Sequence, residues 1–235
     1  KNISGDITNI NIKVPAGATV TWETGAAHGS TPLIPEDSAV KTVTISGGGT
    51  FKATGDGVGP IRAANEGGKL VFKDVTIVDE SQSYAENSWE FGYLEFGGDI
   101  EMINADVQNA IMISGENASF TGCTFNSNKQ NEYAVWVDNG TASFTGCEFT
   151  GSRGLKIHEA YGSDVTSVTV DNSTFGPLSV KPGVAIGDVD GTTAITIKNS
   201  TFKGTQPGDQ SNYMYESDTA VNSFTFTEVN NTVLK

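Results

Sequence analysis

Apolar residues recur along the chain in one short pattern with polar residues between them. Two apolar positions separated by one residue are followed, three positions later, by a small or apolar residue and then by another apolar residue. The copies are Leu70-Phe72-Val75-Ile77, Ile100-Met102-Ala105-Val107, Ala118-Phe120-Cys123-Phe125, Ala142-Phe144-Cys147-Phe149, Val168-Val170-Ser173-Phe175 and Ile195-Ile197-Ser200-Phe202, with a degenerate copy at Phe224-Phe226-Val229. Alternation over three to five residues predicts strands with one buried face, and no segment combines helical spacing with a cap.

A second short apolar segment follows a polar stretch in most repeats. These segments are Ile61-Arg62-Ala63, Leu94-Glu95-Phe96, Ile111-Met112-Ile113, Val135-Trp136-Val137, Leu155-Lys156-Ile157 and Val184-Ala185-Ile186. The second apolar positions of successive copies lie 18 to 30 residues apart. One such unit has too little apolar surface to fold alone, so neighbouring units must stack around a shared core. The pattern therefore predicts an all-β solenoid.

The repeat, with the string Asn-Ser-Thr-Phe at 172–175 and again at 199–202, resembles right-handed parallel β-helix proteins of the pectin-lyase-like type. It is similar especially to the repeat regions of bacterial surface proteins of the adhesin type. The resemblance implies a single domain over residues 1–235: a single-stranded right-handed parallel β-helix of about seven to nine coils. We expect stacked coils over 41–230 and an N-terminal cap or irregular first coils over 1–40. It also implies a secreted or cell-surface location, but the fold does not specify an activity.

The charge and composition exclude two classes of partner. The 28 acidic residues exceed the 14 Lys and Arg residues and give a net charge of −14, which phosphate backbones would repel. No apolar run approaches the roughly 18 residues of a membrane span. We therefore expect neither nucleic-acid binding nor membrane insertion, and we expect a monomer.

The two cysteines occupy equivalent positions of consecutive repeats, 24 residues apart. Stacked parallel strands would place Cys123 and Cys147 about 4.8 Å apart with side chains pointing the same way. Parallel side chains keep the Cβ atoms farther apart than a disulfide prefers, so a ladder of buried free thiols is favoured over a bridge. No second Cys or His pair has the spacing of a zinc site.

The residues between the inward positions of the second segments form outward rows. One row is predicted to contain Arg62, Glu95, Met112, Trp136, Lys156 and Ala185, and the next Gly97, Ser114, Asp138, His158 and Gly187. The candidate ligand-binding patch comprises Tyr93, Glu95, Trp136, Asp138, Lys156 and His158. An exposed Trp beside hydrogen-bonding groups suits carbohydrate, whereas a Trp packed under a neighbouring loop would be structural.

These features favour a non-catalytic binding or adhesion protein whose partner is a glycan or another host-surface ligand. One alternative is a polysaccharide lyase or glycoside hydrolase using Glu95, Asp138, Lys156 and His158. Against it, a Gly-His-Gly segment is missing and Asn139 stands where a lyase-like string would have His. A second alternative is a structural stalk of a larger surface protein.

Calcium is the one cofactor with candidate ligands. Asp188 and Asp190 flank Val189 in a turn-like segment, and Asp99 with Glu101 forms a similar pair. Carboxylates in a bend suit Ca²⁺, but no EF-type loop or Gly-Asp nonapeptide repeat is present. Solvated turn acids are the favoured interpretation, so no cofactor is expected.

Overall fold

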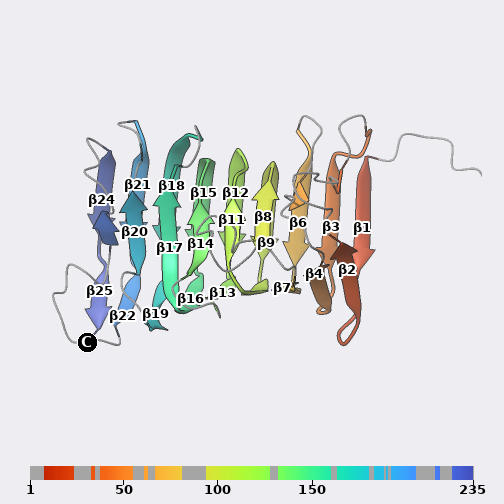
Figure 1. Ribbon diagram of the computed structural model, residues 1–235, viewed down its shortest axis with the longest axis horizontal. Coiled ribbons are helices and arrows are strands. Elements are labelled where there is room, and N and C mark those ends of the chain that lie inside the picture. Colours follow the sequence, from red (N-terminus) through yellow and green to blue (C-terminus); the bar gives the residue numbers. More distant parts are fainter. Residues whose placement is uncertain are drawn as a thin grey trace, which may run out of the picture.

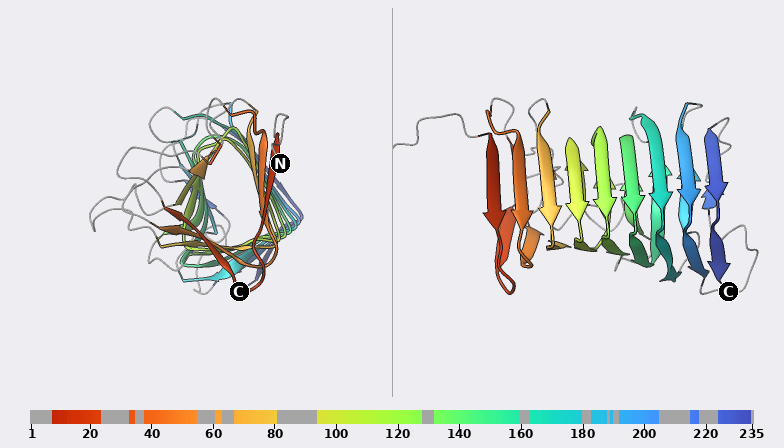
Figure 2. Two further views of the ribbon diagram at one scale, coloured as in Figure 1. Left: turned by 90° about the vertical axis from the view of Figure 1, so that its right-hand side faces the viewer. Right: turned by 180° about the vertical axis from the view of Figure 1, so that it is seen from behind.

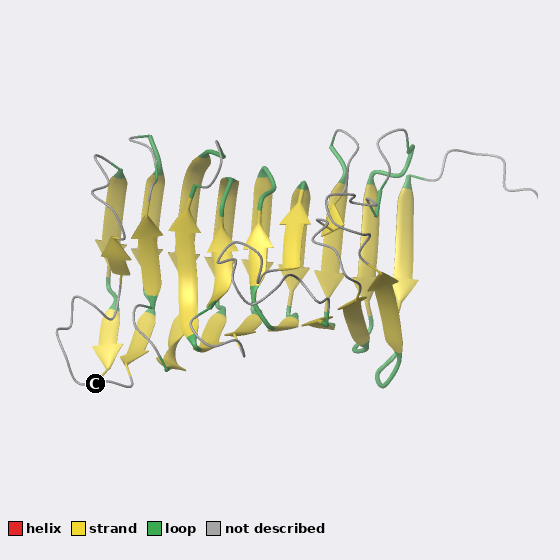
Figure 3. Cartoon of the chain, in the orientation of Figure 1, coloured by secondary structure: helices red, strands yellow, loops and turns green. Residues whose placement is uncertain are grey.

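The computed structural model describes most of the chain as short strands. The described residues are 8–23, 33–34, 38–54, 61–62, 67–80, 94–127, 132–159, 163–179, 183–187, 189, 192–204, 215–217 and 224–234. Every regular element among them is a strand, as Figure 3 shows, and the three sheets that they form are parallel throughout. The predicted all-β parallel β-helix is confirmed. No helix in this part of the chain has the length and apolarity needed to cross a membrane.

The coils from β3 to β23 each contribute one strand to each of three sheets in turn, and the first and last coils contribute described strands to sheets one and two. Strands that neighbour each other in a sheet therefore come from successive coils (Figure 1). Sheet one has nine strands: β1 (Asn9–Lys13), β3 (Thr42–Ser46), β6 (Lys69–Lys73), β9 (Asp99–Ile103), β12 (Asn117–Thr121), β15 (Gly140–Thr145), β18 (Val165–Asp171), β21 (Ala194–Lys198) and β24 (Thr225–Val229). Sheet two also has nine: β2 (Thr19–Glu23), β4 (Thr50–Thr54), β7 (Thr76–Asp79), β10 (Asp106–Gln108), β13 (Thr124–Ser127), β16 (Glu148–Gly151), β19 (Thr174–Leu178), β22 (Thr201–Gly204) and β25 (Thr232–Leu234). Sheet three has seven: β5 (Ile61–Arg62), β8 (Leu94–Gly97), β11 (Ile111–Ile113), β14 (Tyr133–Val137), β17 (Arg153–His158), β20 (Val184–Gly187) and β23 (Tyr215–Ser217).

Viewed along its long axis, the molecule shows three sheets arranged around a central axis (Figure 2). The inward side chains of all three sheets form one buried core. The parallel register stacks equivalent apolar residues of successive coils. In sheet two this produces a phenylalanine ladder of Phe125, Phe149, Phe175 and Phe202. Successive ring centroids are 5.2, 4.5 and 4.7 Å apart, and all four side chains are buried. Each coil alone would leave these rings in water, so stacking stabilises the fold.

The corner between sheets one and two explains the three-residue step in the sequence pattern. From β6–β7 to β24–β25 this corner is always two residues long. Its first residue has a positive φ, near 50° in Asp74, Asn104, Asn172, Asn199 and Asn230 and near 60° in Gly122 and Gly146. Gly, Asn and Asp are the residues that adopt this backbone conformation at least cost. The second corner residue is a buried Val, Ala, Cys or Ser in the first six of these corners and the partly buried Asn231 in the last.

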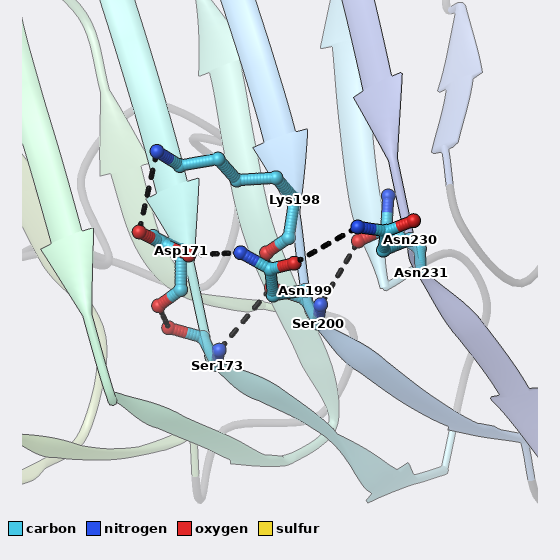
Figure 4. Close-up of polar contacts among 7 residues, drawn as sticks. All are labelled: Asp171, Ser173, Lys198, Asn199, Ser200, Asn230 and Asn231. Carbon is cyan, nitrogen blue, oxygen red and sulfur yellow. Dashed lines mark hydrogen bonds and ion pairs between the residues drawn. The ribbon is translucent and has the colours of Figure 1, made fainter.

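Side chains at this corner link one coil to the next. Asn199 Nδ2 donates to Asp171 Oδ1 over 2.9 Å, and Asn230 Nδ2 donates to Asn199 Oδ1 over 3.5 Å (Figure 4). Lys198 Nζ lies 3.3 Å from Asp171 Oδ2. The hydrogen bond from Asn199, followed by the neighbouring Lys198 ammonium, holds the pKa of Asp171 below its usual 3.8.

Cys123 and Cys147 are buried free thiols in the inward row of this corner, as predicted. Each sulfur contacts the carbonyl two residues earlier, Thr121 O at 3.5 Å and Thr145 O at 3.6 Å. The hydrogen bond with Cys123, together with burial, raises the pKa of the Cys147 thiol, which therefore remains protonated.

Within residues 1–40, β1 and β2 pair with β3 and β4 over five residues each and extend sheets one and two by a regular coil. Two long connections that interrupt the repeats, at 79–90 and 204–219, fall mostly outside the described residues.

Candidate functional site

The outer face of sheet three brings the predicted row of side chains together. Glu95 pairs with Met112, Met112 with Trp136, Trp136 with Lys156, and Lys156 with Ala185, so that four of the five adjacent coils place a non-alanine side chain in this row. The neighbouring row holds His158 beside Gly187. The residues that bind these strands into the core are the alternate ones, such as Val135, Leu155 and Ile157, all fully buried.

Arg62 does not lie in the row that the sequence predicted. β5 pairs Ile61 with Phe96 and Arg62 with Gly97, so Arg62 is aligned two positions further along than expected. A shift of two residues keeps the buried Ile61 in an inward row. The inward–outward alternation therefore cannot distinguish the two registers, because only a one-residue shift exchanges the faces.

Trp136 is buried, with 2% of its surface exposed, and the expectation of an exposed ring for sugar stacking is wrong. Its Nε1–H donates to the carbonyl of His158 over 2.8 Å. The indole forms a second apolar cluster with Ala110, Tyr133 and Ala185, against which Met112 packs. β14 is consequently buried on both faces. Trp136 is the structural centre of this face, which corresponds to the packed alternative considered above.

Two half-buried basic side chains lie around the indole. Lys156 Nζ is 4.4 Å from the centre of the Trp136 ring, a cation–π contact. The His158 ring is 5.9 Å from the same indole and nearly perpendicular to it. Lys156 and His158 are therefore held in place by the tryptophan, and both retain partial exposure. The Lys156 ammonium thus lies on the outer face of sheet three, in a protein whose net charge is −14.

The carboxylates of this face are separated and each is bound by a serine. Ser114 Oγ donates to Glu95 Oε1 over 2.6 Å, and Ser163 Oγ donates to Asp138 Oδ1 over 3.0 Å. Glu95 is partly exposed, whereas Asp138 is only 8% exposed. β11 lies between their strands and Asp138 is two residues further along, so the two Cα atoms are about 12 Å apart by strand geometry.

Asn139, the residue at the position of a lyase-like histidine, has a structural role. Its Nδ2 donates to Ser114 O over 3.2 Å, and its Oδ1 accepts from the backbone N–H of Asp164 over 3.0 Å. The side chain thus connects three successive coils at the end of sheet three.

A further pair on this face was not expected from the sequence. Arg153 Nη1 donates to Tyr133 OH over 3.1 Å, and the guanidinium carbon lies 5.1 Å from the centre of the tyrosine ring. Tyr133 is two residues before the inward Val135, so strict alternation would place it inside the solenoid. Instead it packs with Trp136 in the outer cluster. The sequence feature that could have indicated this packing is the position of Tyr133, an aromatic residue only three residues before Trp136.

The remaining sequence-predicted residues do not add to this group. Tyr93, Asp188 and Asp190 lie outside the described residues. Asp99 accepts a hydrogen bond of 2.9 Å from Asn117, and Glu101 forms an ion pair with Lys69 on the outer face of sheet one. Within the described part of the chain, no three His, Cys, Asp or Glu residues are grouped so that they would hold a metal ion.

Sheet three is also where the lengths of the connections vary. The strands of sheets two and three are joined by between 1 residue (β16 to β17) and 14 residues (β7 to β8). The corner between sheets one and two keeps its two residues in seven coils. In solenoids, insertions of variable length are collected on one face, which is often the binding face.

Comparison of the chain with protein-family models, with curated proteins and with solved structures gives no match.

Proposed function

We propose that this protein is a non-catalytic binding module of the pectin-lyase-like, adhesin type that recognises carbohydrate, at a cell surface or after secretion. The ligand would contact the outer face of sheet three. The observation that carries the proposal is the row of polar side chains across this face: Glu95 on β8, Ser114 directly after β11, and Lys156 and His158 on β17. The buried indole of Trp136 on β14 contacts the last two.

The burial of Trp136 changes how a sugar would be recognised. The indole supports the site from below, and the hydroxyl groups of the ligand would be bound by polar side chains in fixed positions. A carboxylate, a hydroxyl, an ammonium and an imidazole provide both donors and acceptors for sugar hydroxyls. Lys156 and His158 pack on the indole and Ser114 is hydrogen-bonded to Glu95, so less side-chain freedom is lost when a ligand binds.

The test is a glycan array with matched lysine substitutions. Lys156→Met keeps an apolar stem over Trp136 and removes the ammonium, and it should reduce binding at least tenfold. Lys73→Met removes an exposed lysine from sheet one and leaves the net charge the same as in Lys156→Met. Equal binding by both variants, or equal loss in both, would refute the proposed location.

Assays on the wild-type protein distinguish the two other functional classes, an enzyme and a structural stalk. Release of reducing sugars or unsaturated uronides from a polysaccharide panel would identify an enzyme and overturn the non-catalytic proposal. Absence of both glycan binding and product would leave the role of a structural stalk.

A further inference from the structure

The outer face of sheet one changes in character along the solenoid. In β6 and β9 its outward positions include Lys69, Asp99 and Glu101. From β12 to β24 the first two outward rows carry no charged side chain, although 18% of the whole chain is charged. The first row is Asn117, Thr141, Ser167, Ala194 and Thr225, and the second is Ser119, Ser143, Thr169, Thr196 and Thr227. These two rows, in which eight of ten residues are Ser or Thr, are called the hydroxyl array.

The hydroxyl groups of the array are available to a partner. All ten residues are half-buried or exposed. Ser143 Oγ donates to Ala118 O over 3.5 Å, and no other Ser or Thr hydroxyl of the array has a hydrogen-bond partner in the part of the chain that the structure describes. Each hydroxyl can donate one hydrogen bond and accept two. The third outward row, next to the corner, contains the Asp171–Lys198 ion pair and is not part of the array.

The strand spacing gives the array a regular period along the solenoid axis. The five strands lie side by side and nearly parallel (Figure 1). Neighbouring strands are about 4.7–4.9 Å apart, so the hydroxyls of a row repeat at this distance. In ice each water molecule forms hydrogen bonds of about 2.75 Å to four others at tetrahedral angles, which places second-neighbour oxygens about 4.5 Å apart. The difference of about 0.3 Å per coil accumulates to roughly 1.2 Å over five strands, less than half of one hydrogen bond.

The composition of the array also suits a neutral, repeating surface. A charged group would lose its hydration against such a surface without gaining an opposite charge. The β-branch of threonine restricts χ1, so little rotamer freedom is left to be lost on binding. Single hydroxyl contacts are weak, and only a partner with the same period can engage a whole row at once.

We propose that the hydroxyl array binds the surface of ice crystals. The hydroxyls of each row take the places of oxygen atoms in the outermost layer of the lattice, and the bound protein prevents water from joining the crystal there. This further function uses sheet one, whereas the proposed carbohydrate site is on sheet three, so neither proposal depends on the other.

The difference between the melting and the growth temperature of an ice crystal in the protein solution tests the proposal. We expect the wild type at hundreds of micromolar to lower the growth temperature and to give faceted crystals, whereas albumin at the same concentration does neither. Thr169→Lys places an ammonium in the middle of the second row and should reduce the temperature difference at least fivefold. Thr44→Lys makes the same change of charge in the same row but in β3, outside the array, and should retain the wild-type value.

Controls separate loss of ice binding from loss of the fold or of glycan binding. Far-UV circular dichroism verifies that each variant is folded, and Lys156→Met should keep the full temperature difference. A wild type that behaves as albumin does would overturn the proposal, as would equal values for Thr169→Lys and Thr44→Lys. Binding to crystalline cellulose that Thr169→Lys alone abolishes, with no effect on ice, would assign the array to a polysaccharide crystal and would also overturn it.

Discussion

At the scale of single residues, the corner between sheets one and two combines a backbone requirement with a side-chain bond. Asn199 has a φ of 52°, a conformation that achiral Gly adopts freely and that L-residues other than Asn and Asp rarely adopt. Its amide also connects Asp171 of the preceding coil with Asn230 of the following coil. The two contributions are separable, because glycine adopts the positive φ but has no side chain to form the hydrogen bonds.

Replacement of Asn199 should therefore depend on the residue introduced. Asn199→Gly loses the side-chain bonds and keeps the backbone conformation, whereas Asn199→Ala adds left-handed strain of about 1–2 kcal/mol. We expect the alanine variant to be the less stable by roughly this amount in urea denaturation. Equal stability of the two would show that the backbone conformation is not limiting.

Both variants should also raise the pKa of Asp171 toward 3.8, because the hydrogen bond from Asn199 is the main cause of its depression. A carboxyl whose pKa is lowered by folding contributes stability above its unfolded pKa and loses it as the pH falls through the folded value. The stability difference between the wild type and Asn199→Gly should consequently narrow below about pH 3.8. NMR titration of the Asp171 carboxyl measures the shift directly.

The buried thiols give a prediction at high pH. The pKa of Cys147 is raised in the folded state above the ordinary value of 9.0, so folding retains a proton that the unfolded chain releases. The stability that this group contributes is complete below pH 9 and declines as the pH rises above it. Ser173 occupies the position of Cys147 in the next coil, and its hydroxyl donates to the carbonyl of Asp171, two residues earlier. A serine at position 147 can form the same hydrogen bond, so the Cys147→Ser variant should fold. Its unfolding free energy should decline less steeply than that of the wild type above pH 9.

At the scale of the element, the phenylalanine ladder makes each coil depend on its neighbours. Phe175 is stacked between Phe149 and Phe202 with interplanar angles of 3° and 1°. Removal of the Phe175 ring therefore costs contacts with both neighbouring coils. The corner before β19 is only two residues long, so the strand has little freedom to move into the cavity that the ring would leave.

We expect Phe175→Ala to lower the unfolding free energy by about 3–5 kcal/mol. Val233→Ala, in the same row of the last coil, should cost clearly less because Val233 is partly exposed and has a neighbour on one side. Urea denaturation of the two variants measures the contrast. A similar loss in both would mean that the end coil is packed as tightly as the middle.

At the scale of the whole molecule, stability is distributed along one axis. Each coil contacts the coils before and after it, so an end coil has half of the packing of a central one. Local opening should begin at the ends.

Hydrogen exchange should therefore be slowest in the central strands of sheet one, such as β12, β15 and β18, and fastest in β1 and β24. Mass spectrometry of peptides from each strand measures this profile. Uniform protection along the axis would indicate that the solenoid opens as a single cooperative unit.

The sequence by itself determined the strands, the inward rows and the stacked thiols. It also determined the alignment of Glu95, Met112, Trp136 and Lys156, because a repeated apolar pattern can be satisfied only by placing equivalent residues on top of one another. Only the tertiary structure decided the two-residue displacement of Arg62, the burial of Trp136 and the outward packing of Tyr133. Alternation specifies which side of a strand faces the core, but a shift of two residues leaves it unchanged. It also does not show whether the opposite side faces water, since that depends on side chains brought from several coils at once.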